Sequence, residues 1–463
     1  MRTSLFLLLF SNFLLAQHIV TIDNERPRLT VAGDTVDAHD GRVIQFGERY
    51  YWYGTAYGNT SGFTTANHYV CYSSDDLTRW TYEGKLLPDQ AEGVYYRPHV
   101  IHHAASGKYV LWYNWYPTLW EGQFGVATSD VPTGPFTVVD PDVQMKHSDI
   151  GLGDFGLFVD DDQTAYLAYN TIQEHQVSIE RLAPDYLSST LENGGFLAKH
   201  CEAGSMFKRD GRYYLLTDYT CCFCGEGSGA RVYVSDRPLD GYTQHGNINR
   251  YPGIPQPHLS NGRAERFGTT LLTPQHGLRM ETDAPYDAVR LTFAWQNYRT
   301  HCRPGDTTFV HPSDLHPQFD WFREQTSVAT RTTAHHRYAT LELTYHFAAT
   351  QDGPLRFQLD SASVPDGYQL AEVTPLRNGV PLAQTAVYEL GKGQPPIIPS
   401  QQTHIMELKT AHGTAYLWMG DLWGSRPDNI KGHDQQYWSA PLRFRDDGSI
   451  ERLEWTGQWS FER

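Results

Sequence analysis

Three carboxylic residues stand at the same distance, to within one position, ahead of three aromatic-rich segments. Asp40 precedes the segment YYWYG, Asp154 precedes AYLAYN, and Glu202 precedes YYLLTD. If these segments belong to repeats of one structural unit, the three side chains face a single pocket. Closely spaced carboxylates cannot all ionise easily, so one remains a proton donor while another stays charged and activates water. Hydrolysis of a glycosidic bond requires this division of roles.

Within this set, Glu202 is the predicted general acid and Asp40 the predicted base, and Asp154 is expected to orient Glu202 and keep its pKa high. Asp37 is the alternative base. His99 stands at the same offset as Asp40 before another aromatic segment, YVLWYN, and is expected near the same pocket. The alternative is that each carboxylate only caps a turn or pairs with an arginine, but three at one offset argue against that reading.

The elements that position these residues are predicted from a repeated phrase of strand, tight turn and aromatic strand, which is typical of a β-hairpin. The aromatic strands are expected to begin near Tyr50, Tyr109, Ala165, Tyr213 and Ala415. The first four of these positions follow one another at similar intervals, and the fifth comes after a much longer gap. A period of about 50 residues with four short strands is typical of a propeller blade. We therefore predict an all-β fold, a five-bladed β-propeller.

The long gap before the fifth repeat predicts an inserted domain. Blades one to four are expected in residues 17–251, the insert in 252–396, and blade five with the closure in 397–463. Alternating segments such as AVRLTFAW and YATLELTYHF predict a jelly-roll-like β-sandwich there. Such an insert either binds sugar or braces the propeller.

Composition restricts the partners. The formal net charge is −16 and no basic run occurs, so a nucleic acid is not expected to bind. Residues 1–16 have the proportions of a secretory signal peptide, and no later segment is apolar over the length that a transmembrane helix needs. The expected protein is a secreted or periplasmic monomer that does not span the membrane.

Export would favour disulfides among the six cysteines. Three of them crowd into the segment TCCFCGEG, and Cys71, Cys201 and Cys302 are scattered. The scattered residues do not supply the second close pair of a zinc site, so no metal site is predicted. The sequence does not fix which cysteines pair.

On these motifs the chain resembles glycoside hydrolase family 43, whose five-bladed propellers carry an Asp base, an Asp that modulates a pKa and a Glu acid. Asp40 precedes FGERYYWYG, Asp154 precedes LFVDDDQTAYL, and Glu202 lies in CEAGSMFKRDGRYYLLT. The phrases AHDG, RPHVIHHAASGKYV, PSQQT and YLWMGDLW are most similar to the branch of exo-β-1,3-galactanases. That branch often lacks the Asp base present here, and it usually has Glu where this chain has Tyr96.

The resemblance implies an inverting hydrolase that needs no cofactor. Some relatives hold a calcium ion in the propeller channel, so a structural Ca²⁺ there is an expectation. The expected substrate is an oligo- or polysaccharide, from which a secreted, exo-acting enzyme removes galactose, or arabinose or xylose. The rival functions are an α-L-arabinofuranosidase or β-xylosidase of the same fold and a propeller that binds glycans without cleaving them.

Seven further residues are candidates for binding the sugar through hydrogen bonds or ring stacking. Trp115 and Trp120 are the preferred stacking platforms because NWYPTLWEG reads as a loop. The full set is His39, Arg97, His99, Trp115, Trp120, Gln401 and Trp423.

Overall fold

The computed structural model is all-β. It describes residues 19–118, 121–173, 175–198, 201–219, 223, 228–249, 277–281, 284–296, 326–334, 338–352, 355–358, 368–382, 386–389 and 397–463. Within these ranges the helical elements are the short 3₁₀ turns Ser148–Ile150 and Lys431–His433. None of the described residues forms a helix long and apolar enough to cross a membrane.

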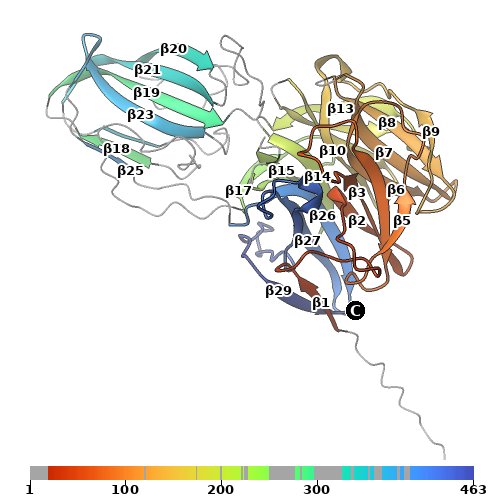
Figure 1. Cartoon of the computed structure of the whole chain (residues 1–463). Coiled ribbons are helices and arrows are strands. Elements are labelled where there is room, and N and C mark those ends of the chain that lie inside the picture. The colour runs from red at the N-terminus through yellow and green to blue at the C-terminus, as the bar shows by residue number, and fades with distance from the viewer. Residues whose placement is uncertain are drawn as a thin grey trace, which may run out of the picture.

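Five antiparallel sheets carry the repeated phrase (Figure 1). The first four sheets have four strands each, and the fifth has three. Their strands are β2 (His39–Phe46), β3 (Arg49–Ala56), β4 (His68–Ser74) and β5 (Thr81–Lys85); β6 (Val94–His103), β7 (Lys108–Tyr116), β8 (Gln123–Ser129) and β9 (Thr137–Asp140); β10 (Leu152–Val159), β11 (Ala165–Thr171), β12 (Val177–Leu182) and β13 (Ser189–Ala198); β14 (Cys201–Arg209), β15 (Arg212–Tyr219), β16 (Arg231–Ser235) and β17 (Thr243–Asn247); β26 (Gln401–Thr410), β27 (Gly413–Leu422) and β28 (Gln435–Trp438).

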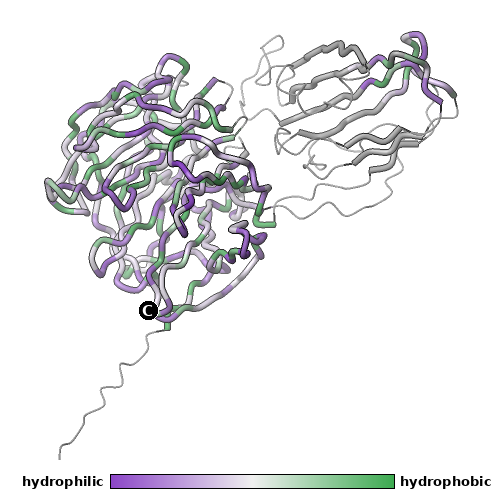
Figure 2. Tube along the Cα trace, turned by 180° about the vertical axis from the view of Figure 1, so that it is seen from behind, coloured by the Kyte–Doolittle hydropathy of each residue, from purple (hydrophilic) through white to green (hydrophobic). Residues whose placement is uncertain are grey.

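The aromatic strands are the second strands of these sheets, β3, β7, β11, β15 and β27, and each starts at or close to its predicted position. Rings from neighbouring sheets pack against one another, as Trp52 of β3 does against Trp438 of β28. Trp52, Trp80 and Trp438 meet edge to face with centroids 5.1 to 6.0 Å apart and are fully buried. Along the strands, hydrophobic and hydrophilic residues are interspersed (Figure 2). Successive residues of β4, β7 and β11 are nevertheless buried, so these strands bury side chains on both faces.

The first strands of the five sheets lie innermost and contact one another in the order β2, β6, β10, β14, β26 and back to β2. Each of them carries a register shift near its N-terminal end. The residues in the shifts are Asp40–Gly41, Arg97–Pro98, Gly153–Asp154, Ala203–Gly204 and Thr403. A bulge turns a side chain away from the direction that strict alternation would give it. The inner ends of all five sheets are therefore bulged at one level.

This register corrects the position predicted for His99. Counting back from the aromatic strand matches His99 with Asp40, but the pairing matches His99 with Arg42 and matches Arg97 with Asp40. The cause is the turn, because only Gly47 and Glu48 separate β2 from β3, whereas the turn between β6 and β7 is twice as long.

The described parts of residues 277–389 contain eight further strands, in two antiparallel sheets that Figure 1 shows apart from the five-sheet body. The sheet orders are β22-β18-β25 and β20-β21-β19-β23-β24. Their strands are β18 (Gly277–Glu281), β19 (Tyr286–Gln296), β20 (Thr326–Ala334), β21 (Tyr338–Gln351), β22 (Leu355–Gln358), β23 (Tyr368–Arg377), β24 (Val380–Pro381) and β25 (Ala386–Glu389).

The disulfide prediction is wrong for Cys71. This thiol is free and buried in β4, and burial raises its pKa well above the usual range. Cys201 is buried in β14, in a different apolar cluster from Cys71. Cys302 and the cysteines of TCCFCGEG lie outside the described residues.

The two ends of the described chain meet beside the fifth sheet. Strand β1 (Ile19–Asp23) pairs with β29 (Gln458–Glu462). The next residue, Asn24, is buried and bonds the backbone of Trp438 in both directions. Its Nδ2 donates to the Trp438 carbonyl at 2.9 Å, and its Oδ1 accepts from the Trp438 N–H at 3.1 Å. One amide side chain thus attaches the N-terminal segment to β28.

We expect Asn24→Ala to lower the free energy of unfolding by about 1–3 kcal/mol, because it leaves the buried Trp438 N–H without its partner. The Trp438 carbonyl keeps the hydrogen bond from Nε1 of Trp459 at 3.0 Å. Urea unfolding monitored by tryptophan fluorescence measures this change. The control is Thr21→Ala, which removes an exposed hydroxyl bond to Ser460 and should cost about 0.5 kcal/mol or less. Equal losses in the two variants would contradict this role for Asn24.

Candidate active site

A pocket opens at the bulged ends of the inner strands. Asp40 reaches it from β2, Asp154 from β10 and Glu202 from β14. The three predicted carboxylates therefore meet in one place. The pocket is lined by Asp40, Tyr57, Phe63, Tyr96, Arg97, Tyr116, Gly153, Asp154, Asn170, Ile172, His175, Glu202, Phe223 and Gln401.

Asp40 is held by three groups on different elements. Its backbone N–H donates to Oδ2 of Asp421 at 2.7 Å, and its own Oδ2 accepts a hydrogen bond from the Tyr57 hydroxyl. Oδ1 lies 4.0 Å from Nη2 of Arg97. Burial raises the pKa of Asp40 to about 6, and the charges of Asp421 and Asp154 act in the same direction. Arg97 and the bond from Tyr57 oppose that rise.

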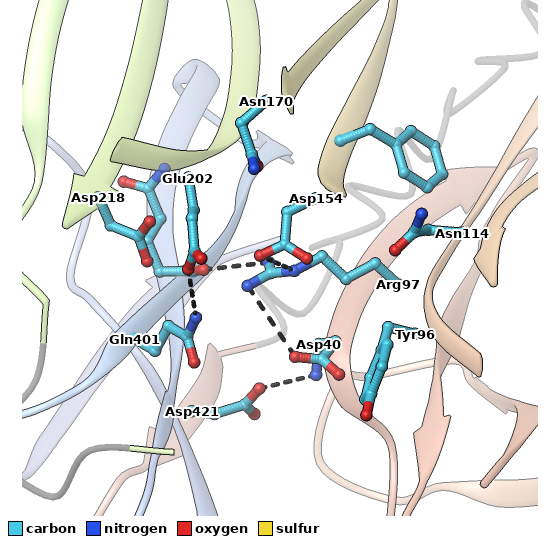
Figure 3. A network of polar contacts seen from close by, with 12 residues as sticks. Asp40, Tyr96, Arg97, Asn114, Asp154, Asn170, Glu202, Asp218, Gln401 and Asp421 are labelled. Atoms are coloured by element: carbon cyan, nitrogen blue, oxygen red, sulfur yellow. Dashed lines mark hydrogen bonds and ion pairs between the residues drawn. The ribbon is translucent and has the colours of Figure 1, made fainter. Parts of the chain in front are cut away.

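Arg97 forms the centre of the pocket floor, between Asp40 and Glu202 (Figure 3). Its Nε lies 2.8 Å from Oδ2 of Asp154, and its Nη1 donates to the Gln402 carbonyl at 3.2 Å. The side chain is only 1% exposed. Burial alone would lower the pKa of Arg97, but the carboxylates of Asp154 and Asp40 raise it above its usual value. Arg97 is thus a permanent cation among carboxylates.

Glu202 lies on the other side of Arg97, with 4% of its side chain exposed. Nε2 of Gln401 donates to Oε2 of Glu202 at 3.4 Å, and Nδ1 of His175 lies 3.4 Å from Oε1. Across the hairpin, Glu202 pairs with Asp218. Burial raises the pKa of Asp218 well above its usual range, and its Oδ2 accepts from the Ser228 hydroxyl at 2.9 Å. Burial therefore favours the protonated form of Asp218 beside Glu202.

His39 does not line the pocket; it supports Asp40 from behind. It is fully buried, and its Nδ1 lies 3.2 Å from Oδ1 of Asp421, the same carboxylate that holds the Asp40 N–H. Burial alone would lower the pKa of His39, but the bond and charge of Asp421, with the charges of Asp37 and Asp40, raise it to about 9. The imidazolium is the predominant form at neutral pH, so Nδ1 donates to Asp421.

Asp37, the alternative base, is held by a turn. Its two carboxylate oxygens accept from the backbone N–H groups of Tyr57 and Gly58 at 3.0 and 2.7 Å. It is not among the residues that line the pocket. These bonds fix the loop that carries Tyr57, whose hydroxyl donates to Asp40.

Of the predicted sugar-binding residues, Gln401 and Arg97 line the pocket. Trp423 lies behind Gln401, is buried, and donates from Nε1 to Oε1 of Gln401 at 2.8 Å. His99 faces away from the carboxylates, in a second cavity, and its Nδ1 accepts the Leu157 N–H at 2.9 Å. The prediction that His99 belongs to the pocket is therefore wrong, for the reason of register given above.

The prediction that Trp115 lies in a loop is also wrong. Trp115 belongs to β7, is buried, and stacks on Tyr95 with centroids 5.6 Å apart. Its Nε1 donates to the Pro141 carbonyl at 2.7 Å. Trp115 packs within its own sheet and is not a stacking platform in the pocket. Trp120 lies outside the described residues.

The described residues do not fit a calcium ion in the channel. In the described ranges, no three His, Cys, Asp or Glu side chains gather as metal ligands. The guanidinium of Arg42 joins the backbones of β2, β6 and β10 beneath the pocket. A fixed cation at that level disfavours a second one.

Several pocket residues were not predicted. Tyr57, Phe63, Tyr96, Tyr116 and Phe223 form an aromatic wall, within which Phe63 lies 5.1 Å from Phe223 and 5.7 Å from Tyr96 between centroids. Polar residues near the ends of four aromatic strands were also missed. Asn170 lines the pocket, whereas Asn114, Asp218 and Asp421 are not among the lining residues. The sequence does carry a signal for all four, because they end the phrases WYN, AYN, LTD and MGD.

The chain matches known proteins in family and fold. Residues 35–253 match the family model described as glycosyl hydrolases family 43. An exo-β-1,3-galactanase from Clostridium thermocellum is 20% identical, with a TM-score of 0.55 over 96% of this chain and 67% of that one. A β-1,3-galactosidase solved with galactodeoxynojirimycin is 18% identical, with a TM-score of 0.54 over 95% and 99%.

A putative exo-β-1,3-galactanase from Bifidobacterium bifidum is 16% identical, with a TM-score of 0.51 over 93% of this chain and 95% of that one. No curated protein sequence matches the chain. The family resemblance predicted from the sequence is confirmed by the family model over residues 35–253, and the structural matches share the fold.

We expect the stability of the protein to fall as the pH rises from about 6.5 through about 9, because His39 has the higher pKa in the folded state and loses its proton there. The contribution is complete below pH 6.5 and amounts to ~3 kcal/mol. Urea unfolding at several pH values measures it. His39→Gln should lack this part of the pH dependence, whereas exposed His433→Gln should retain it. If the free energy of unfolding of His39→Gln depends on pH as that of the parent does, the fall in stability is not due to His39.

Proposed function

We propose that this chain, a glycosidase of family 43, is an exo-acting, inverting hydrolase that releases galactose from the ends of β-1,3-linked galactan chains. In this proposal the five sheets are the blades of a five-bladed propeller, residues 252–396 form an inserted β-sandwich domain, and residues 1–16 direct export of a monomer. The observation that carries the proposal is the meeting of Asp40, Asp154 and Glu202, from three sheets, in one pocket.

The chemistry follows from the positions of these groups. Glu202 gives its proton to the glycosidic oxygen as the bond from the anomeric carbon to that oxygen breaks. Asp40 takes a proton from a water molecule, whose oxygen forms the new bond to the anomeric carbon from the opposite side. Arg97 and Asp154 lie between the two carboxyls (Figure 3), where the sugar ring would lie over them.

The pKa of Asp40 suits the role of base. A catalytic base works best when its pKa lies near the working pH, because it is then both ionised and able to hold a proton. Burial raises the pKa of Asp40 to about 6, which meets this condition in weakly acidic to neutral medium. The Tyr57 hydroxyl and Arg97 keep it from rising further.

The aromatic wall and the floor favour a single sugar at a chain end. Aromatic faces pack on the C–H groups of pyranose rings, and carboxylates and amides bind the hydroxyls. Phe63, at 39% exposure, offers a ring at the mouth, while Tyr57, Tyr96 and Tyr116 are buried deeper. The Arg97–Asp154 pair forms the floor. A walled pocket with a floor accepts a terminus more readily than the middle of a chain.

The sugar is inferred from the relatives. The structural matches with TM-scores above 0.5 are named as acting on β-1,3-galactan or β-1,3-galactosides. The test is therefore a panel of β-1,3-galactan, arabinan and xylan oligosaccharides, with the released monosaccharide identified by chromatography. Release of arabinose or xylose would replace the substrate in the proposal. Binding without release would make the protein a glycan-binding propeller.

Glu202→Gln should reduce release from β-1,3-galactobiose by at least about 10²-fold, because the leaving oxygen then lacks its proton donor. On an aryl galactoside with a strongly acidic phenol, the variant should lose far less of the parental rate, since that leaving group needs no proton. Initial rates on both substrates test this. The control is Glu180→Gln, a buried carboxylate bonded to Tyr169 in the third sheet, which should keep near-parental rates. Equal losses on both substrates would remove Glu202 from the acid role.

The pH profile of kcat/KM should fall on the acidic side with a midpoint near 6, where Asp40 becomes protonated. Tyr57→Phe removes a hydrogen bond that lowers this pKa, so its acidic limb should move to higher pH. The control is Tyr53→Phe, whose hydroxyl bonds the Pro132 carbonyl instead and whose limb should not move. Proton NMR of the first product should show the α-anomer, the inverted configuration. A β-anomer would exclude Asp40 as a base that activates water.

A further inference from the structure

Arg42 is a buried cation directly beneath the pocket floor. It follows the bulge of β2 and is 1% exposed. Its Nη1 donates to the Pro98 carbonyl at 3.1 Å and lies 3.4 Å from the Asp40 carbonyl, and its Nη2 donates to the Phe155 carbonyl. The guanidinium also lies 5.2 Å from the centre of the Phe155 ring.

The three carbonyls belong to the three bulges that carry charged pocket residues. One is the carbonyl of Asp40 itself. The second is that of Pro98, the neighbour of Arg97, and the third is that of Phe155, the neighbour of Asp154. The bulges lie on β2, β6 and β10, three different sheets. One planar guanidinium therefore contacts the backbone at each of these points.

We propose that Arg42 is a positioning residue that fixes the spacing of Asp40, Arg97 and Asp154 by bonding the backbone of all three bulges. Its effect on rate rests on the function proposed above. A guanidinium presents several donors in one rigid plane, so it can set the separation of three acceptors where a flexible ammonium group cannot. Positions of reacting groups matter at this scale, because displacement by about 1 Å can cost about 10²-fold in rate.

The charge of Arg42 also acts on the pocket. Burial lowers the pKa of Arg42 to about 9, with Arg97 acting in the same direction and Asp154 and Asp40 opposing it, so the side chain is a cation at neutral pH. Burial and then Arg42 lower the pKa values of His99 and His404, which are therefore neutral. The titratable groups that face Arg42 are Asp40, Tyr69, Arg97, His99, Asp154 and His404. Within this set, Asp40 and Asp154 are the anions that offset the cation.

Stability alone is a weak reason for a cation in this place. Burying a charge costs free energy unless it is paired closely, and apolar replacements of buried ionic groups are often tolerated. Here the hydrogen bonds go to neutral carbonyls, and the anions act from further away. The arrangement is accounted for if the protein requires three bulges at fixed separation and a positive charge under Asp40.

The test compares Arg42→Met and Arg42→Lys with Arg28→Met. Arg28 is a matched control, because it is also buried, donates to the Gln436 carbonyl and to Asn24, and has a pKa that burial lowers to about 9. It lies over the ring of Trp438 in the fifth sheet and is not among the residues that line the pocket. Measured quantities are Tm, kcat, KM and the pH dependence of kcat/KM on the substrate that the parent cleaves.

Arg42→Met should lower kcat about 10- to 100-fold with a smaller change in KM, and its acidic limb should move to higher pH because Asp40 loses a nearby cation. Compared with Arg42→Met, Arg42→Lys should bring the acidic limb of the kcat/KM profile closer to its parental pH, but it should recover kcat only in part. Arg28→Met should lower Tm and leave kcat and the limb unchanged. If Arg42→Met behaves like Arg28→Met, the positioning role is refuted.

A crystal structure of Arg42→Met separates failure of this inference from failure of the proposed function. If the parent cleaves no glycan, the function fails, and the structure alone decides about Arg42. We expect the Asp40 and Asp154 bulges to move apart and the 2.8 Å contact between Arg97 and Asp154 to open. Bulges and a contact that match the parent would overturn the positioning role, whatever the activity.

Discussion

The bulge at the inner end of each sheet is the constraint on which the pocket depends. In an unbroken strand, alternate residues point to opposite faces, and the side chains at these ends would point into the packing between sheets. The bulges release Asp40, Arg97 and Asp154 from that alternation. Asp40 and Arg97 have positive φ angles of 52° and 50°, which few non-glycine residues adopt. Backbone strain therefore coincides with Asp40 and with Arg97 at the centre of the floor.

Such strain requires contacts that maintain it, and the structure provides them both from neighbouring sheets and from Arg42 of the same strand. The Asp40 N–H is held by Asp421 of the fifth sheet, and its carbonyl is contacted by Arg42. The Arg97 N–H donates to the Thr55 hydroxyl of the first sheet at 3.2 Å. Each of these two bulges is thus fixed by a residue outside its own local turn. The pocket can form only when the sheets are assembled, because no single hairpin contains all the groups that hold its bulge.

The repeated phrase in the sequence was sufficient to predict the aromatic strands and the meeting of Asp40, Asp154 and Glu202. Hydrophobic periodicity and turn residues are local signals, and the same signals occur in each repeat. The position of His99 could not be found by counting, because the turn lengths differ between hairpins and a bulge adds a residue without a sequence signature. Trp115 was assigned to a loop because its neighbours include proline and threonine, yet the strand extends through Tyr116.

The supporting residues were harder to predict than the carboxylates, for a physical reason. Asp421 and Asp40 lie near opposite ends of the sequence, and Arg42 carries no mark that separates it from a surface arginine. The charge balance of a buried site explains why Asp421 and Arg42 lie there. Anions gathered there raise one another's pKa values, so cations must be buried with them. His39, Arg42 and Arg97 supply that positive charge from behind, beneath and within the floor. Burial and the neighbouring carboxylates raise the pKa of Asp40 to about 6 against the opposing effects of Arg97 and the Tyr57 hydroxyl, so its charge is a property of the assembled sheets.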